Sequence, residues 1–450
     1  MRRRTHSVRP YVDRLEARDV PAANLTVTFS PVTHTLTIVG DANDNDVTVK
    51  GDPFDLTHLI LNSSGNIDGV PPPFSTQSGV KNLVFKMLDG NDTVTFDPSV
   101  PIFVRGSVSI DGGAGVNSVA ATHLTVGKNL SVTNAAQTSG LDSVVLIDFS
   151  AGGSVQVKNA GGDSYTAIDR DAAGVSTIKG SLIVTNGTGR DSFNLNDTNV
   201  DGNVRINDGH GNAAGVAGFV NIYNLDNTAL RLIIGGNLTV TYLDGNANTY
   251  DGLWDTEVLG NVTLNHGPGV FTTYMDGYAT HLPVLIHGNL TITGAGANSL
   301  GFGTNNGSGN GSGLIVGKKF TLTSGGGAAE TLAFKNFQVG GETSITLGNG
   351  GNTITINDSI FGGRFTLVSG VGNDTFNLEA TTGTASATEF KKAALIDLGS
   401  GNDVAYLAYN KTPDAGEAVV CLATFEVKTG GSATNYSYFY FPNGGAPLVL

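Results

Sequence analysis

The chain has 450 residues, including 63 glycines but only one tryptophan and three methionines. Its 39 acidic residues outnumber its 25 basic residues and give a formal net charge of −14, which argues against nucleic acid as a partner. The single cysteine, Cys421, excludes an internal disulfide and a cysteine metal site. The chain contains no run of about 18 apolar residues, so no membrane-spanning helix is predicted.

The first 22 residues are basic, with six arginines and three acids, and they lack the apolar stretch of a secretory signal peptide. Composition alone predicts a disordered basic tail. Residues 15–22, Leu-Glu-Ala-Arg-Asp-Val-Pro-Ala, resemble the N-terminal Leu-Glu-x-Arg-x-x-Pro-Ala motif of large secreted or surface repeat proteins of planctomycete bacteria. The segment 24–49 also looks like the first module of those proteins. The resemblance implies export and an extracellular or cell-surface location, and it implies no particular activity.

Residues 23–105 are predicted to form an N-terminal capping β segment and the first coils of a repeat structure. Apolar and polar residues begin to alternate here, as in Leu-Thr-Val-Thr at 25–28. The turn at 88–94, Leu-Asp-Gly-Asn-Asp-Thr-Val, is similar to the RTX nonapeptides, in which stacked aspartates and carbonyl oxygens ligate Ca²⁺. Asp89 and Asp92 are therefore candidate calcium ligands.

One frame recurs through residues 106–407. A glycine is followed by two large apolar residues separated by a polar one, then by a turn and a second alternating strand. The frame repeats roughly every 26 residues, which predicts one coil of a stacked repeat structure per copy. The glycines that begin the copies are Gly106, Gly127, Gly153, Gly180, Gly202, Gly236, Gly260, Gly288, Gly317, Gly341 and Gly363.

The two apolar residues of each copy are predicted to point inward, because their spacing is the period-2 pattern of a strand with one buried face. Helical spacing does not fit this pattern in any of the copies. The predicted inward pairs are Val108/Ile110, Leu130/Val132, Val155/Val157, Leu182/Val184, Val204/Ile206, Leu238/Val240, Val262/Leu264, Leu290/Ile292, Phe320/Leu322, Ile345/Leu347 and Phe365/Leu367.

Each copy continues with a turn rich in glycine and Asn or Asp, such as Gly-Val-Gly-Asn-Asp at 370–374 and Gly-Ser-Gly-Asn-Asp at 399–403. These residues accept the positive φ of a tight corner. A second strand follows, as at 375–378, and a short third segment such as 337–339 leads to the next glycine. Three short strands per coil predict an all-β, right-handed parallel β-helix with almost no helix.

The same turns offer further candidate calcium ligands, namely Asn352, Asp374 and Asp403, because stacked coils would superpose them into a ladder of oxygens. RTX repeats run in tandem every nine residues, whereas a whole coil separates the copies here, so RTX half-sites cannot assemble in their usual way. Turns stabilised by Asx hydrogen bonds are the favoured interpretation. A calcium-binding module stays an alternative, and no other cofactor is required.

Enzymatic activity is another alternative, because parallel β-helices are a common scaffold of polysaccharide lyases and polygalacturonase-type glycosidases. Residues 208–211, Asp-Gly-His-Gly, contain the Gly-His-Gly of polygalacturonase-like enzymes. The paired aspartates and the Arg-Ile-Lys of that family are missing. The candidate catalytic residues are Asp191, Asp208 and His210, and Asp197 is the remaining local carboxylate. A glycine-rich turn that happens to contain a histidine is the favoured interpretation.

Threonines occupy the outward positions of several successive copies. Such an array resembles the surface of ice-binding proteins, and ice or carbohydrate binding through this face is one hypothesis. The β-propensity of threonine explains the array equally well, and earlier copies carry Arg205, Ile183 and Gln156 instead. The row contains Thr239, Thr263, Thr291, Thr321 and Thr366, joined by Thr241, Thr293 and Thr323 one step further on.

Residues 408–450 depart from the frame and are rich in aromatic residues, so we expect an aromatic cap over the open solenoid end. The whole pattern predicts an exported structural or adhesive solenoid of the cell surface without catalytic activity. Its expected partners are cell-surface or matrix polysaccharides or other surface proteins, and neither nucleic acid nor a membrane span. The alternatives are a polysaccharide-binding or polysaccharide-degrading protein and a calcium-binding module.

Overall fold

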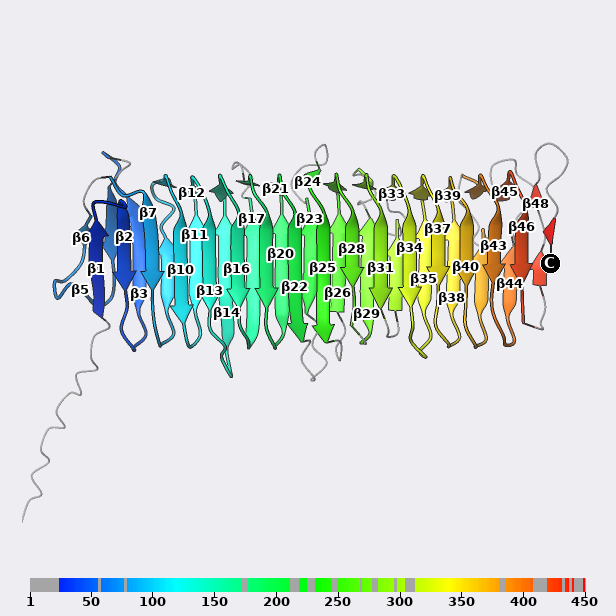
Figure 1. Ribbon diagram of the computed structural model, residues 1–450, viewed down its shortest axis with the longest axis horizontal. Helices are drawn as coiled ribbons and strands as arrows, with labels where there is room; N and C mark the ends of the chain where they lie inside the picture. The colour runs from blue at the N-terminus through cyan, green and yellow to red at the C-terminus, as the bar shows by residue number, and fades with distance from the viewer. Residues whose placement is uncertain are drawn as a thin grey trace, which may run out of the picture.

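Each coil buries its apolar residues against the neighbouring coils, and the result is a long β-solenoid (Figure 1). In this computed structural model, three strands of each coil pair in parallel with the corresponding strands of the next coil and form three sheets. The described residues contain no helix. The predicted all-β parallel β-helix, with three short strands and about 26 residues per coil, is confirmed.

The structure describes most of residues 24–430 and short pieces beyond. The predicted leader, residues 1–22, lies outside the described residues, and so does most of the predicted aromatic cap at 408–450. The described ranges are 24–55, 58–76, 79–170, 176–210, 218–224, 231–244, 249–267, 269–276, 282–294, 298–303, 312–379, 386–407, 419–430, 434–436, 439–440 and 448–449. Among them, none forms a helix of the length and apolarity that crossing a membrane requires.

Sheet 1 contains the strands that carry the inward pair of each predicted copy, together with strands of the first and last coils. Its strands are β1 (Asn24–Ser30), β2 (Thr35–Val39), β5 (Asn66–Ile67), β7 (Asn82–Lys86), β10 (Val108–Gly113), β13 (Leu130–Asn134), β16 (Val155–Asn159), β19 (Leu182–Asn186), β22 (Val204–His210), β25 (Leu238–Asp244), β28 (Val262–Asn265), β31 (Leu290–Gly294), β34 (Phe320–Ser324), β37 (Thr343–Thr346), β40 (Phe365–Val368), β43 (Ala394–Asp397), β46 (Phe425–Lys428) and β49 (Leu448–Val449).

Sheet 2 follows the glycine-rich turns. Its strands are β3 (Asp46–Gly51), β4 (Leu59–Asn62), β6 (Phe74–Ser75), β8 (Thr93–Phe96), β11 (Ser118–Thr122), β14 (Leu141–Ile147), β17 (Asp163–Asp169), β20 (Asp191–Asn196), β23 (Phe219–Tyr223), β26 (Thr249–Trp254), β29 (Phe271–Asp276), β32 (Asn298–Phe302), β35 (Thr331–Lys335), β38 (Thr353–Asn357), β41 (Thr375–Leu378), β44 (Val404–Leu407) and β47 (Thr434–Tyr436).

Sheet 3 is built from the short third segments. Its strands are β9 (Ile102–Val104), β12 (Leu124–Val126), β15 (Ser150–Ala151), β18 (Ser176–Ile178), β21 (Thr198–Val200), β24 (Leu232–Ile234), β27 (Thr256–Val258), β30 (Val284–Ile286), β33 (Leu314–Val316), β36 (Phe337–Val339), β39 (Ile360–Phe361), β42 (Glu389–Phe390), β45 (Val419–Cys421) and β48 (Phe439–Tyr440).

The first coils differ from the rest in their strand direction. β1 pairs antiparallel with β2, and β4 pairs antiparallel with both β3 and β6. The described strands from β10 onward pair in parallel with their neighbours. Antiparallel hairpins therefore occupy the N-terminal end of the solenoid, where a parallel coil would leave unpaired strand edges.

The apolar residues predicted to point inward are all buried. One copy differs in register from the prediction. Thr343 takes the first inward position of β37, because it pairs with Phe320 on one side and Phe365 on the other. Ile345 takes the second position, and Leu347 lies just beyond the strand. Threonine fits this position because it has nearly the shape of valine. A search for apolar pairs missed it because threonine is polar.

The corners of each coil explain the recurrent glycines. A Cβ at Gly288 would lie 2.4 Å from the carbonyl oxygen of Gly260 on the preceding coil, so only glycine fits there. The turns between sheets 1 and 2 contain glycines at positive φ, such as Gly90 at 124°. Between sheets 2 and 3 a single non-glycine residue turns the chain in the left-handed region, as at Asp148 (48°) and Asp358 (50°).

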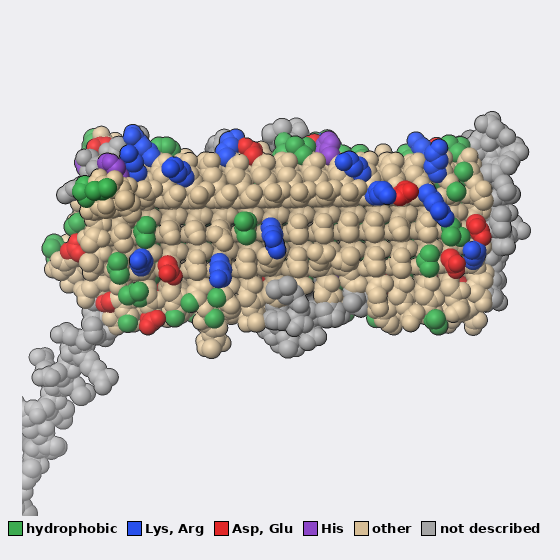
Figure 2. All heavy atoms as spheres, in the orientation of Figure 1, with side chains coloured by type: hydrophobic (Ala, Val, Ile, Leu, Met, Phe, Trp, Pro, Cys, Tyr) green, Lys and Arg blue, Asp and Glu red, His purple; other side chains and the backbone are tan. Residues whose placement is uncertain are grey.

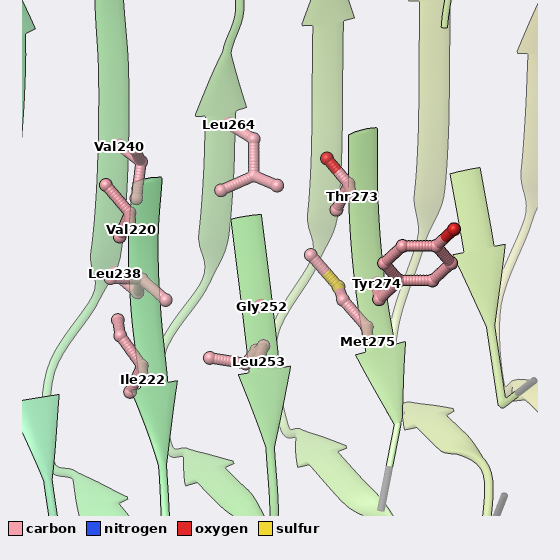
Figure 3. A pocket seen from close by; sticks show the side chains of 10 residues that line it. All are labelled: Val220, Ile222, Leu238, Val240, Gly252, Leu253, Leu264, Thr273, Tyr274 and Met275. Carbon is pink, nitrogen blue, oxygen red and sulfur yellow. The ribbon is translucent and has the colours of Figure 1, made fainter. Parts of the chain in front are cut away.

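The core is filled differently along its length. Near the C-terminal end it is a column of phenylalanines, with ring centroids 4.7 Å apart for Phe361 and Phe365 and 5.1 Å apart for Phe361 and Phe390. In the middle coils, side chains of sheets 1 and 2 surround a cavity of about 10 Å³ (Figure 3). Its lining residues are Val220, Ile222, Leu238, Val240, Gly252, Leu253, Leu264, Thr273, Tyr274 and Met275.

Candidate functional site

A ladder of buried polar side chains runs along the corner where sheet 2 begins. The Asn45 N–H donates to Oδ1 of Asp92 (2.8 Å), the Asp92 N–H to Oδ1 of Asn117 (3.2 Å), and the Asn117 N–H to Oδ1 of Asp142 (2.8 Å). Ser164 lies beside Asp142 in the next coil and donates its hydroxyl to Oδ1 of Asp191 (2.5 Å). We call these six residues the first ladder.

A second ladder occupies the same corner near the C-terminal end. The Glu330 N–H donates to Oδ1 of Asn352 (3.1 Å), the Asn352 N–H to Oδ1 of Asp374 (2.7 Å), and the Asp374 N–H to Oδ1 of Asp403 (3.0 Å). Asn352, Asp374 and Asp403 are thus superposed, as the stacking argument expected. Oδ1 of each of these three residues accepts a backbone N–H group of the preceding coil.

The candidate calcium ligands therefore fall in two kinds of place. Asp92, Asn352, Asp374 and Asp403 are buried rungs of the ladders, whereas Asp89 is exposed in a turn. Within the described ranges, no three His, Cys, Asp or Glu side chains are grouped so as to hold a metal ion. The observed geometry is that of cross-coil Asx hydrogen bonds, which join successive turns to one another.

Burial shapes the electrostatics of the ladders. It raises the pKa of Asp92 to about 6 and that of Asp142 to about 6, because a buried carboxylate loses its hydration. Burial likewise raises the pKa of Asp374, and the neighbouring Asp403 adds a like charge. These carboxyls titrate closer to neutrality than ordinary aspartates.

The candidate catalytic residues Asp191 and Asp208 are brought together. Asp191 begins β20, Asp208 lies near the end of β22, and their carboxyl groups lie within hydrogen-bonding reach of each other. Both are buried, at 1% and 5% exposure. Burial raises the pKa of Asp191 to about 6. Hydrolysis of a glycoside uses two carboxyl groups that flank a bound sugar. Here the two carboxyl groups lie against each other instead.

The other two candidates do not join this pair. Asp197 lies beyond the opposite end of β20, at the corner with sheet 3, so a whole strand separates it from Asp191. His210 is the last residue of β22, and its side chain lies outside the described atoms. Of the three candidate catalytic residues, only Asp191 and Asp208 have described side chains, and these two lie together.

An open cleft of about 530 Å³ lies over the turns that precede β14, β17 and β20. Its one charged lining residue is Asp163, whose Oδ1 accepts the Arg190 N–H at 2.9 Å. The Gln137 side chain donates to the Asp163 carbonyl at 3.3 Å. The cleft is lined by Gln137, Thr138, Ser139, Gly140, Gly162, Asp163, Thr188 and Gly189.

The sequence analysis missed several of these residues, although a signal for them exists. Most rungs stand two residues after a glycine, as in Gly140-Leu141-Asp142 and Gly162-Asp163-Ser164, and these glycines have φ of 102° and 85°. A Gly-x-Asn/Asp/Ser search would have found all the rungs except Asn45 and Glu330. Two asparagine ladders were also missed: the buried Asn134, Asn159 and Asn186, and the exposed Asn203, Asn237, Asn261 and Asn289.

The threonine row forms a continuous face on sheet 1. From β25 to β40, each strand presents two outward residues in register with those of its neighbours, and Figure 2 shows that the central part of this face lacks charged and hydrophobic side chains. We call it the hydroxyl face. Its twelve positions hold Thr239, Thr241, Thr263, Asn265, Thr291, Thr293, Thr321, Thr323, Ser344, Thr346, Thr366 and, at the end of the second row on β40, the apolar Val368.

The hydroxyl face differs from the prediction at two positions. Ser344 stands between Thr321 and Thr366, and Asn265 stands in the second row between Thr241 and Thr293. The Thr293 hydroxyl donates to Oδ1 of Asn265 at 2.8 Å. As predicted, the row ends at Arg205, which pairs with Thr239.

Protein-family models, curated proteins and solved structures were compared with the chain, and none of them matches it.

Proposed function

We propose that the chain is an exported structural and adhesive rod of the cell surface, without catalytic activity, and that its hydroxyl face binds neutral polysaccharide. The single observation that carries the proposal is this uncharged, in-register array on six successive strands of sheet 1. At an inter-strand spacing of about 4.8 Å, the array is about 24 Å long and about 7 Å wide. Its elongated shape suits an extended polymer.

The chemistry of the face favours an uncharged, hydroxyl-rich partner. Threonine and serine hydroxyls both donate and accept hydrogen bonds, as sugar hydroxyls do. A charged ligand would find no opposite charge between Arg205 and Asp397, the charged residues that bound the face on β22 and β43. Asn265 raises an amide among the hydroxyls, so the face is less level than a pure threonine array, which favours a flexible polymer over ice.

Export and surface location are supported by the leader motif at residues 15–22. The absence of catalysis is supported by the burial of Asp191 and Asp208, whose carboxyl groups lie against each other. The structural role is supported by the ladders, whose hydrogen bonds join successive turns to one another. Surface labelling of intact cells with an antibody against the rod tests its location.

Binding is tested with the full chain on columns of neutral and acidic polysaccharides, with the mass of any released products recorded. We expect retention on at least one neutral polymer and no new fragments. Thr263→Lys and Thr321→Lys should weaken retention at least about tenfold, because each puts a hydrated charge in the face. Thr355→Lys on β38 of sheet 2 is the matched control and should behave as the wild type.

Two results would overturn the proposal. New fragments would establish an enzyme. Retention that survives both face variants, or that is lost equally in Thr355→Lys, would place binding elsewhere on the rod. A chelator arm run in parallel tests the calcium alternative, because a ligand that binds only the folded state raises its melting temperature.

A further inference from the structure

The first ladder ends at Asp191, and the carboxyl group of Asp208 is buried beside it. Oδ1 of Asp191 accepts the Ser164 hydroxyl at 2.5 Å, and the Asp191 and Asp208 carboxyl groups lie within hydrogen-bonding reach of each other. The site is closely packed: a Cβ at Gly218 would lie 3.5 Å from Oδ2 of Asp208 and 2.7 Å from the Asp191 carbonyl oxygen. A residue larger than glycine at 218 would therefore crowd the Asp191 backbone and contact Asp208.

Asp191 and Asp208 can hydrogen-bond to each other only when one of them carries a proton. An ionised carboxylate only accepts hydrogen bonds, so two of them cannot bond to each other. Two buried carboxylates in contact also repel, and the pair lowers its energy by keeping one proton between them. The proton belongs to the pair rather than to either residue.

The surrounding charges do not remove this requirement. On β17, Asp163 adds a further negative charge near Asp191. Arg190 lies just before β20 and adjoins Asp191, and its backbone N–H donates to Oδ1 of Asp163. On β22, Arg205 is exposed, and the His210 side chain lies outside the described atoms. Tyr242 of β25 pairs with Asp208, and β19 between β16 and β22 has no ionisable residue.

Asp142, two coils earlier in the same ladder, also needs a proton to complete its hydrogen bonds. Its Oδ1 accepts the Asn117 N–H, and its Oδ2 is buried with no hydrogen-bond partner. Asn117 shows what the second side-chain atom of a rung meets, because its Nδ2 donates to the carbonyls of Gly113 (3.2 Å) and Gly115 (3.3 Å) in its own turn. The corresponding carbonyls for Asp142 are those of Thr138 and Gly140.

We infer that the coils from β14 to β22 form a proton-binding segment, in which Asp191 and Asp208 share one proton and Asp142 takes up another as the pH falls below neutrality. A protonated Asp142 donates from Oδ2 to a carbonyl of its turn, as asparagine does at position 117. The stability of this segment therefore depends on pH and is greatest at mildly acidic pH. This inference does not depend on what the hydroxyl face binds.

The sign of the effect follows from proton linkage. Burial raises the pKa of Asp142 and of Asp191 to about 6, above the usual value near 4. Between about pH 4 and pH 6 the folded state therefore binds more protons than the unfolded state, and stability falls as the pH rises through this window. Acidification from pH 7.5 to pH 5 should strengthen this segment.

The test compares the full chain with Asp142→Asn and Asp208→Asn at pH 7.5 and pH 5.0, in EDTA and in Ca²⁺. At pH 7.5, above the pKa of about 6, Asp142 and the pair have largely lost their protons, whereas asparagine supplies a donor at any pH. Both variants should therefore melt about 2 °C above the wild type at pH 7.5 and with it at pH 5.0. Asp111→Asn, at an exposed position of β10, is the matched control and should show no such pH-dependent difference.

An infrared titration of the wild type supplies a readout that does not depend on the variants folding. We expect a protonated-carboxyl band that titrates near pH 6 and is reduced in Asp142→Asn and in Asp208→Asn. Absence of that band in the wild type would overturn the inference. So would variants that are less stable than the wild type at pH 7.5, or a Ca²⁺-dependent gain in stability that disappears in Asp142→Asn, because a cation would then fill the position assigned to the proton.

Discussion

The phenylalanine-filled coils near the C-terminal end and the middle coils around β26 use the same three-sheet frame but fill it differently. In the former, Phe361 contacts Phe337, Phe365 and Phe390, with ring centroids 4.7 to 6.1 Å apart. In the middle coils, the inward Thr273 borders a small cavity, which Gly252 of the neighbouring strand also lines. The strand frame is therefore set by the backbone ladder, while the packing of each coil varies independently.

The largest expected difference between the two regions concerns large-to-small substitutions. Phe361→Ala should cost about 3–5 kcal/mol, because it removes a fully buried ring from a close-packed column. Met275→Ala, beside the cavity, should cost about 2 kcal/mol, since the flexible side chain already borders empty space. Denaturant unfolding of both variants measures the costs. Equal costs would mean that the two cores are packed equally well.

The second difference is a buried histidine that the phenylalanine column lacks. His266 is stacked on Phe271, with ring centroids 3.6 Å apart, and burial lowers its pKa to about 3. The unfolded state therefore binds a proton between about pH 6.5 and pH 3 that the folded state refuses, and stability falls as the pH falls through this window. The sign is opposite to that of the acidic pair, so the two regions respond differently to acid.

His266→Phe should keep the stacking and remove this penalty. At pH 5 the variant should be more stable than the wild type by about 2 kcal/mol, and the difference should shrink toward zero at pH 8. Thermal unfolding at the two pH values measures it, and Phe320→Leu in the phenylalanine column serves as a control without a pH-dependent effect. A gain of the same size at pH 8 would attribute it to hydrophobicity rather than to the proton.

The sequence predicted the frame well because a solenoid repeats one packing solution, so the inward positions could be read from period-2 alternation anchored on glycine. What it could not predict depends on which residues of different coils meet. The sequence analysis did not single out Asp142 or Ser164, because only the stacking of coils makes them rungs of a ladder. Asp191 and Asp208 were picked for an active site, whereas the fold buries them together. Thr343 escaped notice because an inward polar residue breaks the apolar pattern.

A smaller effect is expected from two buried threonines, one in each region. Thr273 and Thr343 are both fully buried, and their hydroxyls have no hydrogen-bond partner. Thr273→Val and Thr343→Val should each stabilise the protein by about 1 kcal/mol, because valine has a similar shape and no hydroxyl to leave unsatisfied. Chemical unfolding measures the gains. A loss at Thr343 alone would indicate that its hydroxyl meets a water in the more crowded column.

The smallest stability effect is expected where the two regions share a surface. The hydroxyl face crosses both, with Thr263 over the middle coils and Thr321 over the first phenylalanines. Thr263→Val and Thr321→Val keep β-branched side chains on the strands, so each should change the stability by less than about 0.5 kcal/mol. Each also removes one hydroxyl from the face, so polysaccharide retention should weaken in both, and to a similar degree. If Thr263→Val alone weakened retention, the binding surface would be confined to the middle coils, and the packing beneath it would then matter to function; equal weakening would mean that the surface works as one array whatever fills the core below.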